Sequence, residues 1–386
     1  MAGSPVVDWL ISGLNVIIGR FSLKPIEHNL MKGKPLSSQK GQAEAFFLID
    51  DKGRWWILKK FHPNSELEQG YLHKVARLLP GEQPFISGAN RLILSQYSLK
   101  KTRGYYFDKE LATWLNGTIL MPRVDGLDWA GLADGIREGS TVLDPSDRIR
   151  ICRAFASIAR ILESKQCSHR DFSCGNIFID MNTGTVSLID FDSLYHPSLR
   201  IPRATTCGTT GYMPHLVWRN GNPDPRTTWC ERADRYALAL LNAEFLLVDR
   251  RSRVTGDGGL FDQEELRRQS GTNLDRIVLN MNTKYPGAAE LLKSAIHCRS
   301  FSDCPSPQDW INFCDLMQNS QVTVPKLESS PKTIRQRIVG ILGSHKCETS
   351  QPKAPRLVDM PLPKLHIPTV PKIKAPKVKL PPDPWT

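Results

Sequence analysis

The decisive stretch of this sequence is Cys167-Ser168-His169-Arg170-Asp171-Phe172-Ser173-Cys174-Gly175-Asn176, which is followed by Leu188-Ile189-Asp190-Phe191-Asp192. Asn176 lies five residues after Asp171, and Asp190 lies 14 residues after Asn176, at the end of an apolar run. With this spacing, one carboxylate can orient or deprotonate an acceptor hydroxyl, while an amide oxygen and a second carboxylate hold Mg²⁺ against phosphates. The pattern therefore predicts phosphoryl transfer from a metal-bound nucleotide.

The length and composition of the chain indicate a soluble globular protein. The chain has 386 residues, of which 40% are hydrophobic and 23% are charged, which suits a two-lobed globular body with a tail. Its nine cysteines show no paired C-x-x-C spacing, which argues against a disulfide framework and a zinc site and favours a cytoplasmic location. The apolar stretch Trp9–Ile18 is too short and too polar to span a bilayer, so we expect a short helix or strand there.

The net charge of +12 is concentrated at the end of the chain. Residues 325–386 contain 12 Lys/Arg, 4 Asp/Glu and 12 of the 28 prolines, so we expect an extended or disordered tail. The tail can be a solvated linker, or its Pro368-Thr369-Val370-Pro371 stretch can dock a partner with an aromatic groove. Its charge also suits an anionic membrane surface, whereas its scarcity of aromatic residues argues against nucleic acid.

The remaining pattern predicts alternating strands and helices. The predicted strands are Gln42–Ile49 and Arg54–Phe61 around a turn at 50–53, an apolar strand within 117–124, and a pair at Gly175–Ile179 and Thr185–Ile189. The predicted helices are Ser65–Leu79, Asp144–Lys165, Arg232–Val248 and Gly287–Cys298.

Together, the loop at 167–176 and the motif at 188–192 resemble the catalytic loop and metal-binding motif of the protein kinase superfamily. The similarity is to eukaryotic-like Ser/Thr kinases, in particular bacterial members, with Asp-Phe-Asp in place of Asp-Phe-Gly. It implies an α+β, bilobal fold with a small β-rich N-lobe and a mainly helical C-lobe. The implied divisions are an N-terminal extension (1–32), N-lobe and hinge (33–123), C-lobe (124–324) and a disordered Pro/Lys-rich tail (325–386).

The resemblance also assigns catalytic roles. Asp171 would orient the acceptor hydroxyl, although an Asp after His-Arg is by itself more often part of a surface pair. Asn176 and Asp190 would bind Mg²⁺, and Lys59 would reach the ATP phosphates, with Lys60 as the alternative because neighbouring strand residues face opposite ways. Arg170 would pair with a phosphate placed on the segment that follows the metal-binding motif.

The nucleotide site implied by the resemblance includes a poor match to the glycine-rich loop. Gly41 and Gln42 would lie over the phosphates, and Met121 and Arg123, within 118–124, would line the adenine pocket. Glu68 is the candidate partner of Lys59.

Other matches lie further along the chain. Gly208–Pro214 resembles the substrate-binding end of an activation segment, and Thr205 and Thr206 before it are candidate autophosphorylation sites. Asp234 matches the buried Asp that braces the catalytic loop, and it can also cap its own helix. His215 stands where kinases place an acid, and Ser173 stands where Ser/Thr kinases place Lys.

These features predict an ATP- and Mg²⁺-dependent protein kinase that modifies Ser/Thr hydroxyls of a protein substrate, including its own. A kinase-like pseudoenzyme or scaffold that acts through its basic tail is the alternative, and a small-molecule kinase is a third reading. A docking partner for the tail and a cognate phosphatase are the partners that the resemblance suggests.

Overall fold

The computed structural model describes residues 5–18, 21–40, 43–62, 69–79, 92–94, 109–202, 205–255 and 259–322. The chain forms two units, Met1–Pro325 and Lys326–Thr386, and every described residue belongs to the first of them. The expectations for Gly41, Gln42, Glu68 and the tail at 325–386 therefore lie outside the described residues.

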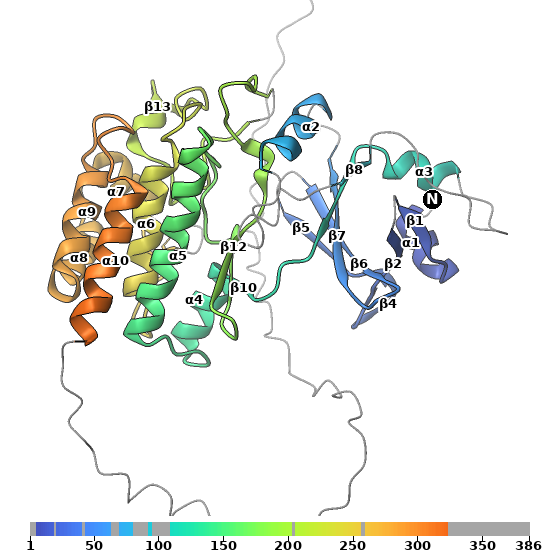
Figure 1. Ribbon diagram of the computed structural model, residues 1–386, viewed down its shortest axis with the longest axis horizontal. Helices are drawn as coiled ribbons and strands as arrows, with labels where there is room; N and C mark the ends of the chain where they lie inside the picture. Colours follow the sequence, from blue (N-terminus) through green and yellow to red (C-terminus); the bar gives the residue numbers. More distant parts are fainter. Residues whose placement is uncertain are drawn as a thin grey trace, which may run out of the picture. The chain divides into compact units, whose positions relative to one another are not determined.

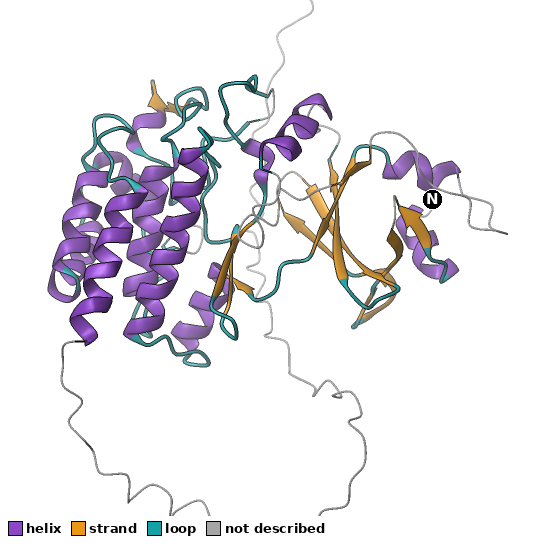
Figure 2. Cartoon of the chain, viewed as in Figure 1, coloured by secondary structure: helices purple, strands orange, loops and turns teal. Residues whose placement is uncertain are grey.

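The fold is α+β, with an antiparallel sheet followed by a mainly helical region (Figures 1 and 2). Within the described residues the sheet has seven strands in the order β1-β2-β6-β7-β9-β8, with β5 also paired to β6. The strands are β1 (Val16–Ile18), β2 (Phe21–Pro25), β5 (Ser37–Lys40), β6 (Ala43–Asp50), β7 (Trp55–Phe61), β8 (Leu92–Leu94) and β9 (Thr118–Pro122). A small hairpin, β3 (Glu27–His28) with β4 (Met31–Pro35), lies between β2 and β5 in sequence. The predicted hairpin at 42–61 is the β6–β7 pair.

Side chains alternate along β6 and β7, so these strands present two different faces. One face packs against helices α1 (Pro5–Ser12) and α3 (Lys109–Leu115) in what we call the rear cluster. Its buried members are Val6, Trp9, Ile18, Leu23, Phe46, Leu48, Trp56, Leu58, Leu111, Leu115 and Leu120. The opposite face, which includes Ile57 and Lys59, lines a cavity. The stretch expected as a short helix or strand thus contributes to both α1 and β1.

The helical region carries a second, larger cluster around one buried helix. Its helices are α4 (Trp129–Glu138), α5 (Pro145–Ser164), α6 (Asp234–Leu247), α7 (Gln263–Arg268), α8 (Thr272–Lys284), α9 (Pro286–Ile296) and α10 (Pro307–Val322). Every residue of α6 except Arg235 is buried, which explains its nearly continuous apolar sequence. Arg235 forms an ion pair with Glu163 of α5, with Nε 2.7 Å from Oε1.

The predicted helix positions agree with the structure to within a few residues. At the start of α5, the side chain of Asp144 accepts a hydrogen bond from the backbone of Asp147, and Pro145 occupies the first turn. Helix α2 (Gln69–Leu78) is the described part of the helix expected at 65–79. No helix in the described ranges is long and apolar enough to cross a membrane.

A buried carboxylate fixes the β6–β7 turn. Asp50 accepts hydrogen bonds from the backbone of Lys52 and Arg54, from Arg54 Nε and from Trp56 Nε1, at 2.8 to 3.1 Å. Burial alone would raise the pKa of Asp50, but these hydrogen bonds lower it to about 2. A carboxyl whose pKa is depressed on folding stabilises the fold above its unfolded pKa and loses that effect as the pH falls.

We therefore expect Asp50→Asn to lower the free energy of unfolding at pH 7 by about 2 kcal/mol. The difference from the wild type should shrink as the pH falls from about 5 towards 2. Urea unfolding across this range measures it, with Asp51→Asn, at the exposed next position of the turn, as the control. A difference that stays constant with pH would contradict the assignment.

Candidate active site

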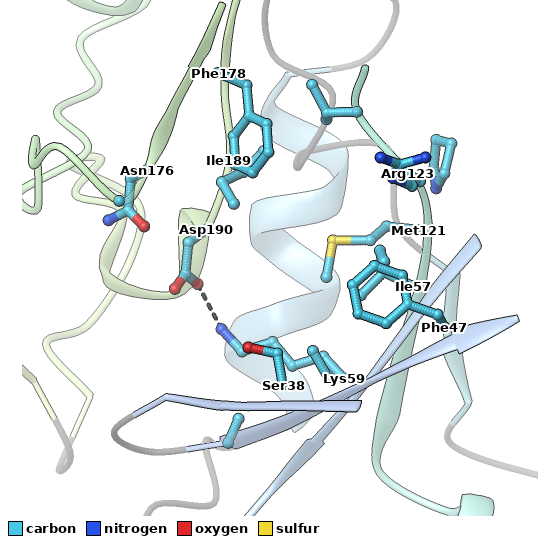
Figure 3. Close-up of a pocket in the computed structure, with 15 residues that line it drawn as sticks. Ser38, Phe47, Ile57, Lys59, Met121, Arg123, Asn176, Phe178, Ile189 and Asp190 are labelled. Carbon is cyan, nitrogen blue, oxygen red and sulfur yellow. Dashed lines mark hydrogen bonds and ion pairs between the residues drawn. The ribbon is translucent and has the colours of Figure 1, made fainter. Parts of the chain in front are cut away.

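A cavity of about 300 Å³ lies between the sheet and the loops of the helical region. It is lined by Ser38, Ala43, Ala45, Phe47, Ile57, Lys59, Met121, Pro122, Arg123, Val124, Gly175, Asn176, Phe178, Ile189 and Asp190. Figure 3 shows Phe47, Ile57 and Met121 across from Phe178 and Ile189, with Lys59 and Asp190 joined at the other end. The cavity therefore has an apolar part and a charged part.

The strand register places Lys59, rather than Lys60, at this cavity. Lys59 pairs across the sheet with Ala45 and Ile119, and its side chain lines the cavity. Lys60 faces the other way and donates hydrogen bonds to the carbonyls of Trp114 and Asn116, at 2.9 and 3.1 Å. Those carbonyls belong to the end of α3, so Lys60 has a structural role there.

Lys59 is paired with carboxylates from the Asp-Phe-Asp motif. Its Nζ lies 2.6 Å from Asp190 Oδ1 and also donates a hydrogen bond to Asp192 Oδ2. Burial lowers the pKa of Lys59, but the two carboxylates more than offset this and raise it above its ordinary value. Burial raises the pKa of Asp190, the Lys59 ammonium opposes the rise, and Asp192 adds to it.

Asp190 owes its position to a tight turn after β12 (Thr185–Leu188). It has φ 68° and ψ 59°, in the left-handed region that residues other than glycine seldom adopt. The short helix η3 (Phe191–Ser193) follows, and Phe191 is fully buried with its ring 4.9 Å from that of His169. His169 Nε2 is bonded to the carbonyl of Ile189 at 2.8 Å, so the turn is tied to the loop at 167–176.

That loop brings Asp171 and Asn176 together. Asn176 Nδ2 donates to the backbone oxygen of Asp171 at 2.9 Å and to Oδ2 of Asp171 at 3.2 Å. Asp171 Oδ1 accepts a hydrogen bond from Thr209 Oγ1 at 2.8 Å. Asn176 belongs to the cavity lining, whereas Asp171, to which it is hydrogen-bonded, does not. The sequence singled out Thr209 only as part of the stretch Gly208–Pro214, and its bond to Asp171 was missed, because spacing does not say which threonine of the segment faces inward.

The side chain of Asp234 holds this loop by its backbone. Its carboxylate accepts hydrogen bonds from the backbone N–H of His169 at 2.6 Å and of Arg170 at 2.7 Å. Burial raises the pKa of Asp234 to about 7, although both backbone hydrogen bonds favour the charged form. The N-cap of α6 is Ala233, which makes no side-chain cap hydrogen bond, so Asp234 braces the loop rather than capping its own helix.

Arg170 is buried against the segment after η3. Its backbone has φ 69°, and its guanidinium lies 4.8 Å from the ring of Trp229. Its hydrogen-bond acceptors among the described residues are neutral oxygens: the carbonyls of Ser193, Thr206, Pro225 and Thr228 and the hydroxyls of Thr205 and Thr228. The positive charge of Arg170 is thus solvated by dipoles instead of by a carboxylate.

The other expected positions behave differently. Met121 and Arg123 line the cavity, but the backbone N–H of Arg123 donates to Trp55 O and its guanidinium lies over the Trp55 ring. His215 is bonded through Nε2 to the carbonyl of Cys298 at 2.8 Å. Ser173 is buried within the loop.

A metal ion would have few protein ligands here. Within the described ranges, no group of three or more His, Cys, Asp or Glu side chains is arranged to hold one. Asn176 and Asp190 fit a cation that phosphate oxygens also bind, because Asn176 directs its amide nitrogen to Asp171 and leaves its oxygen towards the cavity.

No protein-family model matches this chain, and no curated protein matches its sequence.

The brace predicts a specific loss of stability. Asp234→Ala leaves two buried backbone N–H groups without acceptors, so we expect the free energy of unfolding to fall by about 2–4 kcal/mol. Chemical denaturation measures this, with Asp134→Ala as the control, because the Asp134 side chain is 64% exposed. Equal, small effects of the two substitutions would argue against the brace.

Proposed function

We propose that this protein is an ATP- and Mg²⁺-dependent protein kinase that phosphorylates Ser/Thr hydroxyls, including its own. The observation that carries the proposal is the meeting of Lys59, Asn176 and Asp190 at one end of an otherwise apolar cavity. The two-part architecture, with a β-sheet before a helical region, is what a protein-kinase-like fold requires.

The cavity suits a nucleotide at both ends. A purine ring fits the apolar part between Met121 and Ile189, where burial of its faces favours binding (Figure 3). The phosphates would then reach Lys59, whose ammonium binds anionic oxygens. Mg²⁺ held by Asn176 and Asp190 would neutralise charge on the phosphates.

Asp171 supplies the group that handles the acceptor. Its carboxylate is fixed by Thr209 and Asn176, so one oriented oxygen can accept the hydroxyl proton as the acceptor oxygen attacks the γ-phosphorus. The bond from that phosphorus to ADP breaks as the new one forms. Catalysis rests on positioning and on charge stabilisation by Lys59.

The segment beside Asp171 favours a protein acceptor over a small molecule. Gln263 accepts a hydrogen bond from the backbone of Gly211 and donates one to the carbonyl of Met213, at 2.8 and 2.9 Å. The hydroxyl of Tyr212 donates to buried Glu244 at 3.0 Å. These bonds fix the backbone of residues 211–213, close in the chain to Thr209, whose hydroxyl donates to Asp171, so this segment is our candidate support for a peptide acceptor.

The further roles concern partners and location. A protein substrate is proposed from this segment, whereas a docking partner for the Pro/Lys-rich tail and a cognate phosphatase rest on the resemblance alone. A cytoplasmic location fits the eight described cysteines, none of which forms a disulfide. The scaffold alternative depends on the tail, which lies outside the described residues.

Phosphate transfer tests the proposal directly. With radiolabelled ATP and Mg²⁺, the wild type should label itself and a basic carrier protein such as myelin basic protein. Asp190→Asn and Asp171→Asn should each reduce labelling by at least about 100-fold, because each removes a group that acts on the transferred phosphate. Chelation of Mg²⁺ should have the same effect, and the exposed Asp134→Asn should have none. No labelling by the wild type would refute the proposal.

Autophosphorylation has a candidate target in the structure. Thr205 Oγ1 lies 2.7 Å from Arg170 Nη1, so a phosphate on Thr205 would pair with a buried cation whose acceptors in the described ranges are neutral oxygens. The double variant Thr205→Ala/Thr206→Ala should contain less phosphate and transfer it about tenfold more slowly. Mass spectrometry and initial rates measure both, with Thr183→Ala as the control. Unchanged phosphate content and rate would eliminate these sites.

A further inference from the structure

The last residue of the Asp-Phe-Asp motif, Asp192, bonds directly to the cavity lysine. Its Oδ2 accepts a hydrogen bond from Lys59 Nζ, and its side chain is only 12% exposed. The η3 turn makes this contact possible, since Phe191 enters the core while the flanking Asp190 and Asp192 both reach Lys59. A glycine at position 192 would have no side chain for this bond.

The arrangement gives one ammonium two carboxylates, and they are not equivalent. Asp190 lines the cavity and is 34% exposed, so it is the acid that a metal bound with the phosphates would recruit. Asp192 is not part of the cavity lining and lies further inside. If Asp190 bound a cation, Asp192 would be the acid that remains with Lys59.

We infer that Asp192 is a positioning residue that keeps Lys59 aimed at the phosphates while Asp190 serves the metal. The inference deepens the proposed function and rests on it. In the described chain, both carboxylates bonded to Lys59 come from a single three-residue turn.

Helix α2 contributes to this turn in another way. The described residues of α2, Gln69–Leu78, include no acid. Tyr71 of this helix donates its hydroxyl to the carbonyl of Leu194 at 2.7 Å, immediately after η3. Helix α2 therefore supports the turn through a neutral hydrogen bond, while Asp192 supplies charge to Lys59.

The first measurement needs neither nucleotide nor metal. The purified full chain is treated briefly with an amine-acylating ester, and modification of Lys59 is compared with that of Lys60 by mass spectrometry. An amine that donates to two carboxylates reacts slowly, so Asp192→Ala should raise the Lys59/Lys60 ratio several-fold. Asp192→Asn, which keeps the shape but not the charge, should raise the Lys59/Lys60 ratio less than Asp192→Ala does. Asp192→Glu, which keeps the charge, should bring the ratio part of the way back to that of the wild type.

The second measurement follows the bound state. Asp192→Ala should weaken binding of a fluorescent ADP in the presence of Mg²⁺ about tenfold, raise the KM for ATP and lower kcat. Thermal unfolding identifies any variant that fails to fold, and Asp134→Ala is the matched control. Should the Ala variant fail to fold, the Asn and Glu variants carry the same comparison.

The outcomes separate the two ideas. An unchanged Lys59/Lys60 ratio together with unchanged nucleotide affinity in folded Asp192 variants would overturn the role of Asp192. A changed Mg²⁺ requirement with normal Lys59 reactivity would overturn it in favour of a metal ligand. Absence of transfer by the wild type would overturn the proposed kinase function, while the acylation ratio would still decide on Asp192.

Discussion

The site depends on one buried carboxylate, that of Asp234, which holds the loop at 167–176 by its backbone. This loop has no strand ladder of its own at His169 and Arg170, so their N–H groups need an acceptor inside the protein. Helix α6 supplies it from a position that its packing makes rigid. His169 Nε2 is then bonded to the carbonyl of Ile189, directly before Asp190. Asp171 and Asn176 follow in the same loop and are hydrogen-bonded to each other.

The parts of the site that follow from local spacing could be predicted from the sequence. Asp171 and Asn176 belong to one loop, and Asp190 directly follows a short hairpin, so their proximity follows from nearby residues. The predicted helices and the β6–β7 hairpin rest on the same kind of local signal. A protein-kinase-like arrangement beyond this α+β architecture remains a proposal.

Long-range contacts were beyond the reach of sequence reasoning. Alternation along β7 shows that Lys59 and Lys60 face opposite ways, but only the position of α3 shows which faces the cavity. The bonds from Lys59 to Asp192 and from Thr209 to Asp171 join segments far apart in the chain. The position of Asp234 at the start of a helix allowed it to be a cap, a brace or both. In the folded protein its carboxylate oxygens accept hydrogen bonds from the loop.

The rear cluster has a consequence for how the sheet responds to a ligand. Neighbouring residues of β9, Ile119 and Leu120, belong to different hydrophobic clusters, so the sheet is anchored on both sides. The rear anchor involves α1 and α3 and none of the residues that line the cavity. Side chains on the cavity face can therefore change rotamer without disturbing the apolar contacts behind the sheet. The amide protons of β6 and β7, held in the strand ladder and backed by the rear cluster, are then expected to stay protected from exchange when the cavity is occupied.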